Sequence, residues 1–594
     1  MPGDYAAIRD YAVIGDGRTA ALVRRDASID WLCLPNLDSP SVLAAILDPQ
    51  RGGCVELAPS APHRAERAYV PGTNVLTTTF RTEAGVARVT DAMTLPDGRL
   101  GPFRELARRI EGLGGEVPMR WRVAPRFNYG RGVTRITRRS PFPTADCRGD
   151  AVAICAWDAG DLRCEAGAVT GSFVARAGSR ALLALVAAHG EPLVFPARGE
   201  VESRLDSTAE FWRAWSARLT YDGPWREAVV RSALALKLLV FAPSGAIAAA
   251  PTTSLPETIG GDRNWDYRFS WIRDSSFTLE AMLQLGCHVE ANSFFWWFMH
   301  ATRLMRPRLQ PFYRLDGGAF APETALPLAG YRASRPVRIG NGAAHQLQLD
   351  TFGNLLDTAF GYANRGFGID RETGTELAQL ADFVCTIWRQ PDRGIWEVRM
   401  EPRHFTHSKA MCWVALDRAI RLAEAGTLPA THVARWRDEA ANIRRFIDER
   451  CWCEPRQTYV RFAGTEEVDA SLLMLAIMRY EDPRSPRMRG TIDAIQRELG
   501  RGPIVYRYRG DDGLGGDEGA FVCCSFWLVE ALALAGRRRE ASELMARVLD
   551  LANDVGLYAE EIAVDSHEFL GNFPQGLVHL ALISAAVACA AEPS

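Results

Sequence analysis

Short runs of hydrophobic and β-branched residues, separated by turn-forming residues, recur through the first third of the chain. Two of these runs, 74–82 and 86–93, flank Glu83-Ala84-Gly85, which is a sequence signal for a β-hairpin. A second pair, 21–25 and 29–34, flanks another short turn. Three further runs follow at 151–157, 172–177 and 181–187. This spacing predicts a β-sandwich.

From about Pro224 the hydrophobic positions recur with the period of an α-helix. In residues 408–424, hydrophobic side chains form one stripe, and most of the charged side chains lie off it. Ser408 or Thr406 is suited to cap the start of this helix, and Gly426 is suited to its end. The same criteria predict twelve helices, near 224–241, 274–286, 288–304, 345–364, 374–389, 408–425, 430–449, 469–480, 487–499, 519–535, 538–552 and 574–590.

Twelve helices joined by loops of uneven length fit six helical hairpins that close into a ring. An α-solenoid would also supply paired helices, but the sequence contains no repeat of fixed period. We therefore expect an antiparallel β-sandwich domain at 1–204, a linker at 205–223 and a helical domain at 224–594. In a helical ring, the longer connections form the rim of a cavity, and we expect the function to reside there.

The composition, with 47% hydrophobic and 24% charged residues among 594, is typical of a soluble globular protein with two or more domains. A formal net charge of −3 gives no reason to expect a nucleic acid or an anionic membrane as partner. The start of the sequence lacks a secretory signal pattern, and no hydrophobic run reaches the ~18 residues that suggest a membrane span. The thirteen cysteines show neither a disulfide framework nor a zinc pattern, so we expect buried free thiols and a cytoplasmic location.

Three loop segments, 260–274, 394–401 and 556–562 with 571–575, mix aromatic residues with carboxylates, and the first two also contain arginines. This mixture suits sugars, because aromatic rings pack on the apolar face of a pyranose and charged planar groups hydrogen-bond its hydroxyls. In the second segment Glu397 follows Trp396. A carboxyl desolvated beside an indole has a raised pKa, as a general acid requires. Solvated loops held together by ion pairs are the alternative for all three segments.

Hydrolysis of a glycoside requires two carboxyl groups on opposite sides of the scissile bond, ~6.5–9.5 Å apart when the anomeric configuration inverts. The sequence allows Glu397 and Glu560, on different loops of one ring, to face each other across such a bond. Glu561 is the alternative to Glu560, since both lie in the third segment.

Five motifs follow one another along the helical part of the chain, at 261–268, 271–274, 335–341, 396–397 and 571–575. Two more, at 14–16 and 28–35, lie in the part with strand-like runs. Together they resemble glycoside hydrolase family 15, which holds glucoamylases, glucodextranases and prokaryotic trehalases, over nearly the whole chain. The resemblance implies a β-sandwich followed by an (α/α)6 barrel, in agreement with the twelve predicted helices.

The resemblance also implies roles for individual residues. Glu397 matches the general acid, and Glu560 matches the general base better than Glu561 does, on its spacing to Glu568. Arg273 and Asp274 match a pair that grips the non-reducing glucose. Other substrate contacts that follow from the resemblance are Trp271, Trp396, Arg507 and Glu518, the last of which could instead cap the following helix.

The function that the resemblance implies is exo-acting, inverting hydrolysis of an α-glucoside with release of β-glucose. Trehalose is the favoured substrate, because compact bacterial members without a signal peptide resemble the trehalase branch. A glucoamylase or an isomalto-oligosaccharide glucohydrolase is the alternative. Fungal glucoamylases carry an acidic residue where this chain has Val398, so the site for the leaving group differs from that of a starch-degrading enzyme.

Two other classes of protein stay open. An α-glucoside phosphorylase would use phosphate in place of a base-activated water, and a non-catalytic sugar-binding protein would lack one of the two carboxyls. We expect no cofactor or metal: His404 and His407 have no third ligand, and the acidic segment 511–518 lacks the alternation of an EF-hand loop. The expected partner is a small carbohydrate, and a homo-oligomer is compatible with the sequence.

Overall fold

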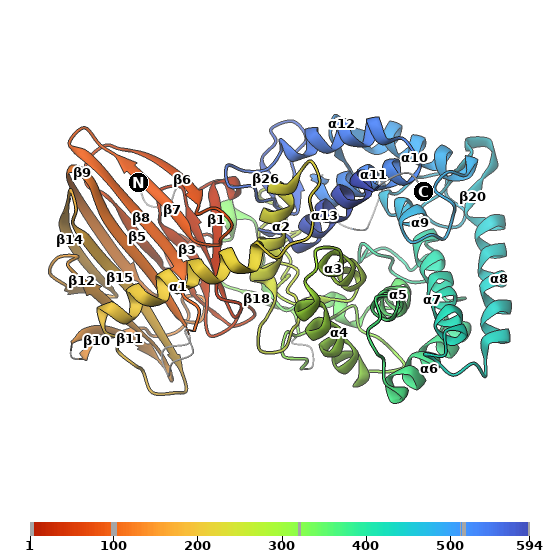
Figure 1. Cartoon of the computed structure of the whole chain (residues 1–594), viewed down its shortest axis with the longest axis horizontal. Helices are drawn as coiled ribbons and strands as arrows, with labels where there is room; N and C mark the ends of the chain where they lie inside the picture. The colour runs from red at the N-terminus through yellow and green to blue at the C-terminus, as the bar shows by residue number, and fades with distance from the viewer. Residues whose placement is uncertain are drawn as a thin grey trace.

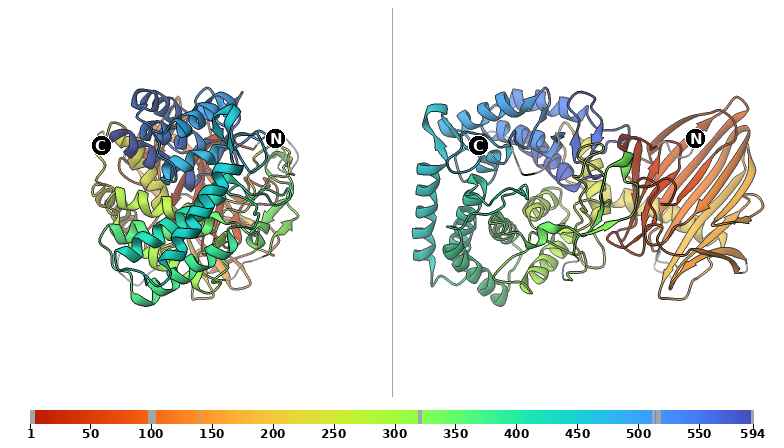
Figure 2. Two further views of the ribbon diagram at one scale, coloured as in Figure 1. Left: turned by 90° about the vertical axis from the view of Figure 1, so that its right-hand side faces the viewer. Right: turned by 180° about the vertical axis from the view of Figure 1, so that it is seen from behind.

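The computed structural model describes residues 5–96, 104–139, 141–318, 322–510, 513 and 518–591. A domain of strands comes first along the chain, and a domain of helices follows it (Figure 1). The two lie side by side along the long axis of the molecule, and the same arrangement is visible from behind (Figure 2).

The described part of the first domain forms fifteen strands, all paired antiparallel. Where a strand has one buried face, as β7 does, burial alternates along it because successive side chains point to opposite faces. The strands are β1 (Tyr11–Gly15), β2 (Ala20–Arg24), β3 (Ile29–Cys33), β4 (Ser41–Leu43), β5 (Cys54–Pro59), β6 (Arg64–Tyr69), β7 (Leu76–Arg81), β8 (Gly85–Met93), β9 (Glu105–Ala124), β10 (Arg135–Arg139), β11 (Phe142–Cys147), β12 (Asp150–Trp157), β13 (Arg163–Glu165), β14 (Ala168–Arg176) and β15 (Arg180–His189).

The long strand β9 joins two sheets. Its first half pairs with β8 and β15, and its second half pairs with β5 and β14. One sheet runs β6–β7–β8–β9–β15–β12–β11–β10, the other runs β1–β2–β3–β5–β9–β14–β13, and β1 contacts β8 across the gap between them. The predicted antiparallel β-domain is therefore confirmed, including the hairpins β7–β8 and β2–β3.

All twelve predicted helices are confirmed within the described residues, and a thirteenth, α1, precedes them. The segment predicted near 469–480 is shorter than expected, with a 3-10 turn at Ala470–Leu473 before α9. The helices are α1 (Arg198–Ser216), α2 (Arg226–Leu239), α3 (Arg273–Gln284), α4 (His288–Arg303), α5 (Asp350–Asn364), α6 (Arg371–Ile387), α7 (Thr406–Glu424), α8 (Val433–Arg450), α9 (Met474–Ile477), α10 (Pro486–Leu499), α11 (Val522–Leu534), α12 (Arg538–Leu549) and α13 (Gly576–Ala590).

Helix α1 crosses the predicted boundary between residues 204 and 205, so the expected linker is helical over its first part. Its buried positions, among them Val201, Leu205, Trp212 and Trp215, recur with a helical period and pack it along the β-domain. The division of the chain at 204 and 223 stays a prediction, because α1 belongs to neither predicted domain alone.

Six helices form an inner ring. In the order α3, α5, α7, α9, α11 and α13, each contacts the next, and α13 contacts α3, so the ring is closed. The intervening helices α2, α4, α6, α8, α10 and α12 lie outside it (Figure 1). Inner helices such as α11 and α13 are hydrophobic on nearly every side, as helices enclosed by others must be. This is the arrangement of an (α/α)6 barrel.

Buried hydrogen bonds tie the two domains together. The Trp31 indole donates to the Pro251 carbonyl at 2.8 Å, and the Asn74 amide donates to the Leu234 carbonyl at 3.0 Å. From the helical side, the Asn553 amide donates to the Tyr11 carbonyl at 2.8 Å. Because unmade hydrogen bonds of buried groups are costly, these contacts fix the position of one domain on the other. None of the described helices is both long enough and apolar enough for a membrane span.

Candidate active site

A cavity of about 290 Å³ lies among the loops that precede the inner helices. Its walls come from the loop before α3, the loop before α5, the loop before α7 and the connection between α10 and α11. The lining side chains include Glu257, Arg263, Trp265, Tyr267, Trp271, Asn341, Gln346, Trp396, Glu397, Arg399, Arg507 and Glu518. Two of the three predicted loop segments therefore contribute directly to one cavity.

Glu397 lines this cavity and is largely buried, with 15% of its side chain exposed. Arg273 donates to its Oε1 atom at 3.1 Å, and the Gln348 amide lies 3.4 Å from the same oxygen. Burial raises the pKa of Glu397 to about 7, although Arg273 and Arg507 act in the opposite direction. A carboxyl that holds its proton near neutrality and faces a cavity can act as a general acid.

The backbone of Glu397 adopts a left-handed conformation, with φ of 52°. Residues other than glycine rarely adopt it, and where it is held by the surrounding structure it often marks a functional site. Here the Gln346 amide donates to the Glu397 carbonyl at 3.2 Å, which supports the turn.

Glu560 is 1% exposed and immediately precedes strand β25 (Glu561–Ile562). Its Oε2 atom accepts a hydrogen bond from the Asn572 backbone amide at 3.3 Å, and the neighbouring Tyr267 phenol acts to lower the pKa of its carboxyl. Its Oε1 atom has no hydrogen-bond partner among the described residues. Burial and the neighbouring Glu257 raise the pKa of Glu560 to about 8.

Tyr267 connects the two carboxyls. The residue lines the cavity, and the carboxyls of Glu560, Glu257 and Glu397 all help burial to raise the pKa of its phenol. Glu560 does not line the cavity itself, but three side chains that interact with its carboxyl do, namely Glu257, Tyr267 and Arg507.

Glu561 is held differently from Glu560. Arg507 forms an ion pair with its Oε1 atom at 3.0 Å, and the Gly519 amide donates to its Oε2 atom at 3.0 Å. Burial raises the pKa of Glu561 well above its ordinary value, and the guanidinium of Arg507 opposes this shift. The Oε1 atom of Glu560 has neither a hydrogen bond nor an ion pair among the described residues, whereas each oxygen of Glu561 has a partner, so Glu560 is the better candidate for contact with a water.

Arg507 and Glu518, both predicted as substrate contacts, belong to one charged cluster in the cavity wall. The Arg507 guanidinium lies 2.8 Å from Glu518 and 3.1 Å from Glu257, and it stacks 5.7 Å from the centre of the Trp396 ring. Glu518 also pairs with Arg263. Glu257 escaped the sequence analysis because it lies outside every motif, whereas Arg263 belongs to the 261–268 motif.

Arg273 and Asp274 are placed next to Glu397, at the start of α3. Arg273 donates to the Asp274 carboxylate at 2.9 Å and to the Ile395 carbonyl at 3.0 Å, and its guanidinium lies 5.1 Å from the Trp271 ring centre. Burial raises the pKa of Asp274, and its Oδ2 atom has no hydrogen-bond partner among the described residues. Neither of these two side chains lines the cavity, so a direct contact of the pair with glucose stays a prediction.

Trp271 and Trp396, by contrast, both line the cavity. Trp271 packs against Tyr267 and Phe312, with ring centres 5.6 and 4.8 Å away. The Trp396 indole donates to Asp469 at 3.0 Å, which orients the ring that precedes Glu397. Two aromatic rings are thus available to pack on a sugar.

The described residues contain no cluster of three or more His, Cys, Asp or Glu side chains arranged for a metal ion. Of the two histidines considered above, His404 packs on Phe446 and His407 is buried, which lowers its pKa to about 3. Most of the acidic segment 511–518, at 511–512 and 514–517, lies outside the described residues.

Comparison with known proteins identifies the family. The family model for glycosyl hydrolases family 15 matches residues 223–587, which is more than half of the chain. The chain belongs to this family. A second model, for the N-terminal region of trehalase-like proteins, matches residues 3–141. The family assignment makes this protein a glycoside hydrolase, whose substrate is a carbohydrate.

Relatives in the family match it over nearly their whole length. The chain is 36% identical to a trehalase of Thermoplasma volcanium, over 98% of this chain and 93% of the relative. It is 38% identical to a trehalase of Mycobacterium tuberculosis, over 98% of this chain and 89% of that one. A bacterial glucoamylase solved with acarbose superimposes with a TM-score of 0.73 at 12% identity, covering 99% of this chain and 94% of that chain, which shows the shared fold.

Proposed function

We propose that this family 15 protein hydrolyses α,α-trehalose with inversion of configuration, with Glu397 as the general acid and Glu560 as the general base. The observation that carries the mechanism is the pair of buried carboxyls around Tyr267, one lining the cavity and the other retaining an unpartnered oxygen. Similarity to trehalases over nearly the full length of both chains supports the choice of substrate.

In the proposed reaction, the protonated Glu397 carboxyl gives its proton to the glycosidic oxygen as the bond from that oxygen to the anomeric carbon breaks. A water attacks the same carbon from the opposite face and gives a proton to Glu560. One glucose leaves with the β configuration and the other keeps the α configuration. The Oε1 atom of Glu560 is the acceptor, because its Oε2 atom already accepts from Asn572.

The remaining predicted residues hold the sugar in this proposal. Trp271 and Trp396 supply the ring faces, and Arg507 and Glu518 supply hydrogen bonds from the cavity wall. Arg273 and Asp274 grip the glucose that is cleaved off, once it displaces part of their present contacts. A cavity of about 290 Å³ is small among ligand sites, which favours a disaccharide over a long glucan.

A disaccharide panel followed by proton NMR tests the proposal. We expect trehalose to be cleaved and maltose and isomaltose to be left nearly untouched, with equal initial amounts of α- and β-glucose from trehalose. Faster cleavage of maltose or isomaltose would assign the glucoamylase-like or isomalto-oligosaccharide activity instead. Initial release of α-glucose alone would contradict inversion.

The same panel, run with and without inorganic phosphate, separates a hydrolase from a phosphorylase. Release of glucose 1-phosphate would contradict the proposal, and the presence of a second buried carboxyl, Glu560, argues for hydrolysis. We propose a cytoplasmic location as well, because the described cysteines are free thiols and most of them are buried.

A further inference from the structure

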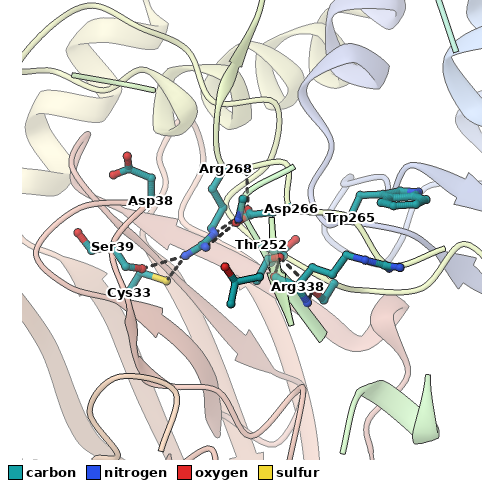
Figure 3. Close-up of polar contacts among 12 residues, drawn as sticks. Cys33, Asp38, Ser39, Thr252, Trp265, Asp266, Arg268 and Arg338 are labelled. Carbon is teal, nitrogen blue, oxygen red and sulfur yellow. Dashed lines mark hydrogen bonds and ion pairs between the residues drawn. The ribbon is translucent and has the colours of Figure 1, made fainter. Parts of the chain in front are cut away.

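The loop before α3 points its side chains in two directions. Trp265, Tyr267 and Trp271 line the cavity, whereas Asp266 and Arg268, between them in sequence, point toward the β-domain (Figure 3). Extended backbone produces this alternation, since successive side chains lie on opposite sides. One short segment therefore has a substrate side and a side that faces the other domain.

Asp266 and Arg268 form a two-pronged ion pair. The Arg268 Nε and Nη2 atoms lie 2.8 and 2.7 Å from the two carboxylate oxygens of Asp266. The two residues are 0% and 2% exposed. An ion pair at this depth contributes little net stability, but the loss of either partner leaves a buried charge uncompensated. Its geometry is well defined because a planar guanidinium matches a carboxylate along two parallel bonds.

The third nitrogen of this guanidinium reaches into the β-domain. Arg268 Nη1 donates to the Ser39 carbonyl at 2.9 Å and lies 3.5 Å from the Cys33 thiol, at the end of β3 (Figure 3). The Tyr129 ring, also from the β-domain, lies 5.8 Å from the guanidinium. The β-domain thus supplies the surface against which Arg268 is fixed.

Asp266 extends the connection to a second wall of the cavity. Its Oδ2 atom accepts a hydrogen bond from the Gly340 amide at 3.0 Å. The next residue, Asn341, lines the cavity. A shift of Asp266 therefore moves two walls, the one before α3 and the one before α5.

A second chain of hydrogen bonds leads from the same loop to Glu560. The side-chain amide of Asn572 donates to the Trp265 carbonyl at 3.0 Å, and the backbone amide of the same residue donates to the Glu560 carboxylate at 3.3 Å. Thr252 donates to the Asn572 side-chain oxygen at 2.9 Å. Since the Tyr267 phenol and the Glu560 carboxyl also shift each other's pKa, both neighbours of Asp266 in sequence are coupled to the proposed base.

We propose that Asp266 and Arg268 are positioning residues through which the β-domain holds the walls of the catalytic cavity and the proposed base. The β-domain is then a structural part of the active site. The inference rests on the proposed hydrolytic function. Misplacement of catalytic groups by about 1 Å can lower turnover on the order of 100-fold, so a small shift of the loop is enough.

Asp266→Asn and Arg268→Lys test the proposal. Asn keeps the shape of Asp266 and loses its charge, and Lys keeps the charge of Arg268 and loses the fork. We expect each variant to lower kcat on the preferred disaccharide by about 10–100-fold, with a smaller change in KM. The pH profile of kcat/KM should also shift, because the contacts of Glu560 change.

Arg67→Lys is the matched control. Arg67 is a buried arginine of the β-domain that pairs with Asp554 of the helical domain at 2.7 Å and donates to the Asp10 carbonyl at 2.6 Å. It bridges the same two domains but contacts no residue of the cavity. We expect this variant to be less stable than the wild type but to keep kcat within about two-fold, since the contacts of Arg67 involve none of the catalytic residues.

Amide hydrogen exchange of the peptide 262–272 gives a second readout. Exchange should be faster in Asp266→Asn and Arg268→Lys than in Arg67→Lys or the wild type. If one of the two variants does not fold, the other decides the matter. Wild-type kcat, pH profile and exchange in a folded variant of either residue would overturn the inference. If the wild type cleaves another α-glucoside but not trehalose, only the proposed substrate is refuted. The variants are then compared on the sugar that the wild type does cleave, and the inference is tested in the same way.

Discussion

At the scale of single residues, burial sets the chemistry of Glu397 and Glu560. Each is enclosed by protein, which disfavours the charged form of a carboxyl. They differ in what surrounds them: Glu397 has Arg273 at 3.1 Å, whereas Glu560 has Tyr267 and a backbone amide as partners. The two carboxyls therefore share a raised pKa and differ in their partners.

Replacing either carboxyl by its amide tests these roles. We expect Glu397→Gln and Glu560→Gln each to lower kcat by about 10²–10⁴-fold, because neither amide can transfer the required proton. Glu401→Gln, on the same loop as Glu397 but exposed, and Glu568→Gln, near Glu560 but paired with Arg332, are the controls. Steady-state kinetics and circular dichroism measure activity and folding. Near-wild-type turnover in either first variant would refute its assigned role.

The pH dependence of activity follows from the same environments. Turnover needs Glu397 protonated, so it falls as pH rises above the Glu397 pKa of about 7, and it needs Glu560 ionised, so it falls as pH decreases below the Glu560 pKa of about 8. Because the value for the base lies above that for the acid, the active form is a minority of the molecules and is most populated between pH 7 and 8. Burial raises both pKa values, and the two limbs of the profile belong to the interacting pair. We expect a bell-shaped kcat/KM profile with its maximum near neutrality. A maximum near the ordinary carboxyl value of 4.5 would contradict this expectation.

Sequence reasoning found Glu397 because an indole precedes it, and the structure raises its pKa by burial as expected. The cause of that burial is less local than the motif suggests. The Trp396 ring packs on Phe521 and Trp527, which lie more than a hundred positions along the chain. Glu257 could not be predicted at all, since only the fold brings it to 3.1 Å from Arg507.

At the scale of elements, the short three-stranded sheet beside the cavity places Glu560. Strand β25 pairs with β24 (Ala520–Phe521) on one side and with β26 (Phe569–Leu570) on the other. Gly571 directly follows β26 with φ of 73°, and a Cβ atom there would lie 2.5 Å from the Glu560 Oε2 atom. Only glycine leaves room for the carboxyl in this position.

Gly571→Ala tests that constraint, with Gly536→Ala as its matched control. Gly536 has φ of 81°, and a Cβ atom there would have no atom of the described residues within 4 Å, so both variants carry the same backbone strain of about 1–2 kcal/mol. We expect only Gly571→Ala to displace Glu560 and lower kcat on the order of 100-fold. Equal kinetics in the two variants, together with equal melting temperatures, would show that the close approach has no catalytic consequence.

The existence of helices was predictable, and their exact extent was less so. Residues 345–349 were expected to be helical, but Leu349 precedes α5 and residues 342–345 form a 3-10 turn capped by Asn341. That turn is part of the cavity wall, where function overrides helical propensity. Helix α1 was missed even though its buried positions recur at helical spacing, because strand-like runs before it set the expectation for that region.

At the scale of the whole molecule, buried carboxyls away from the cavity affect stability rather than catalysis. Glu530, near the C-terminal end of α11, is partly buried with one carboxylate oxygen enclosed, and this desolvation raises its pKa to about 7. A folded-state pKa above the unfolded value of 4.5 means that this residue stabilises the protein below pH 4.5 and that the contribution is lost as pH rises toward 7.

Glu530→Gln removes this dependence. Between pH 4.5 and 7, the free energy of unfolding of the wild type should fall relative to that of the variant by up to about 1.4 kcal/mol per pH unit. Denaturant unfolding at several pH values measures the difference, and Glu543→Gln on α12, at a side chain that is 62% exposed and paired with Arg539, is the surface control. A pH-independent difference for Glu530→Gln would contradict the assigned burial.

How the domains meet could not be read from the sequence. The Arg268 guanidinium and the Ser39 carbonyl are 229 positions apart, and no local pattern relates them. The sequence motif contains Asp266 and Arg268, and its side chains alternate, with aromatic residues on one side and the ion pair on the other. The reason for this alternation is visible only in the folded protein, where the β-domain lies against the ion pair.

The closed inner ring has a consequence for how the chain is made. Helix α13 fills the place between α11 and α3, and it is the last of the six inner helices to leave the ribosome. The β-domain, complete by residue 189, can fold while synthesis continues, but the barrel stays open until residue 590 has emerged. Every newly made molecule therefore passes through an inactive stage with the apolar flanks of α3 and α11 uncovered, which is the stage at which a chaperone would be needed.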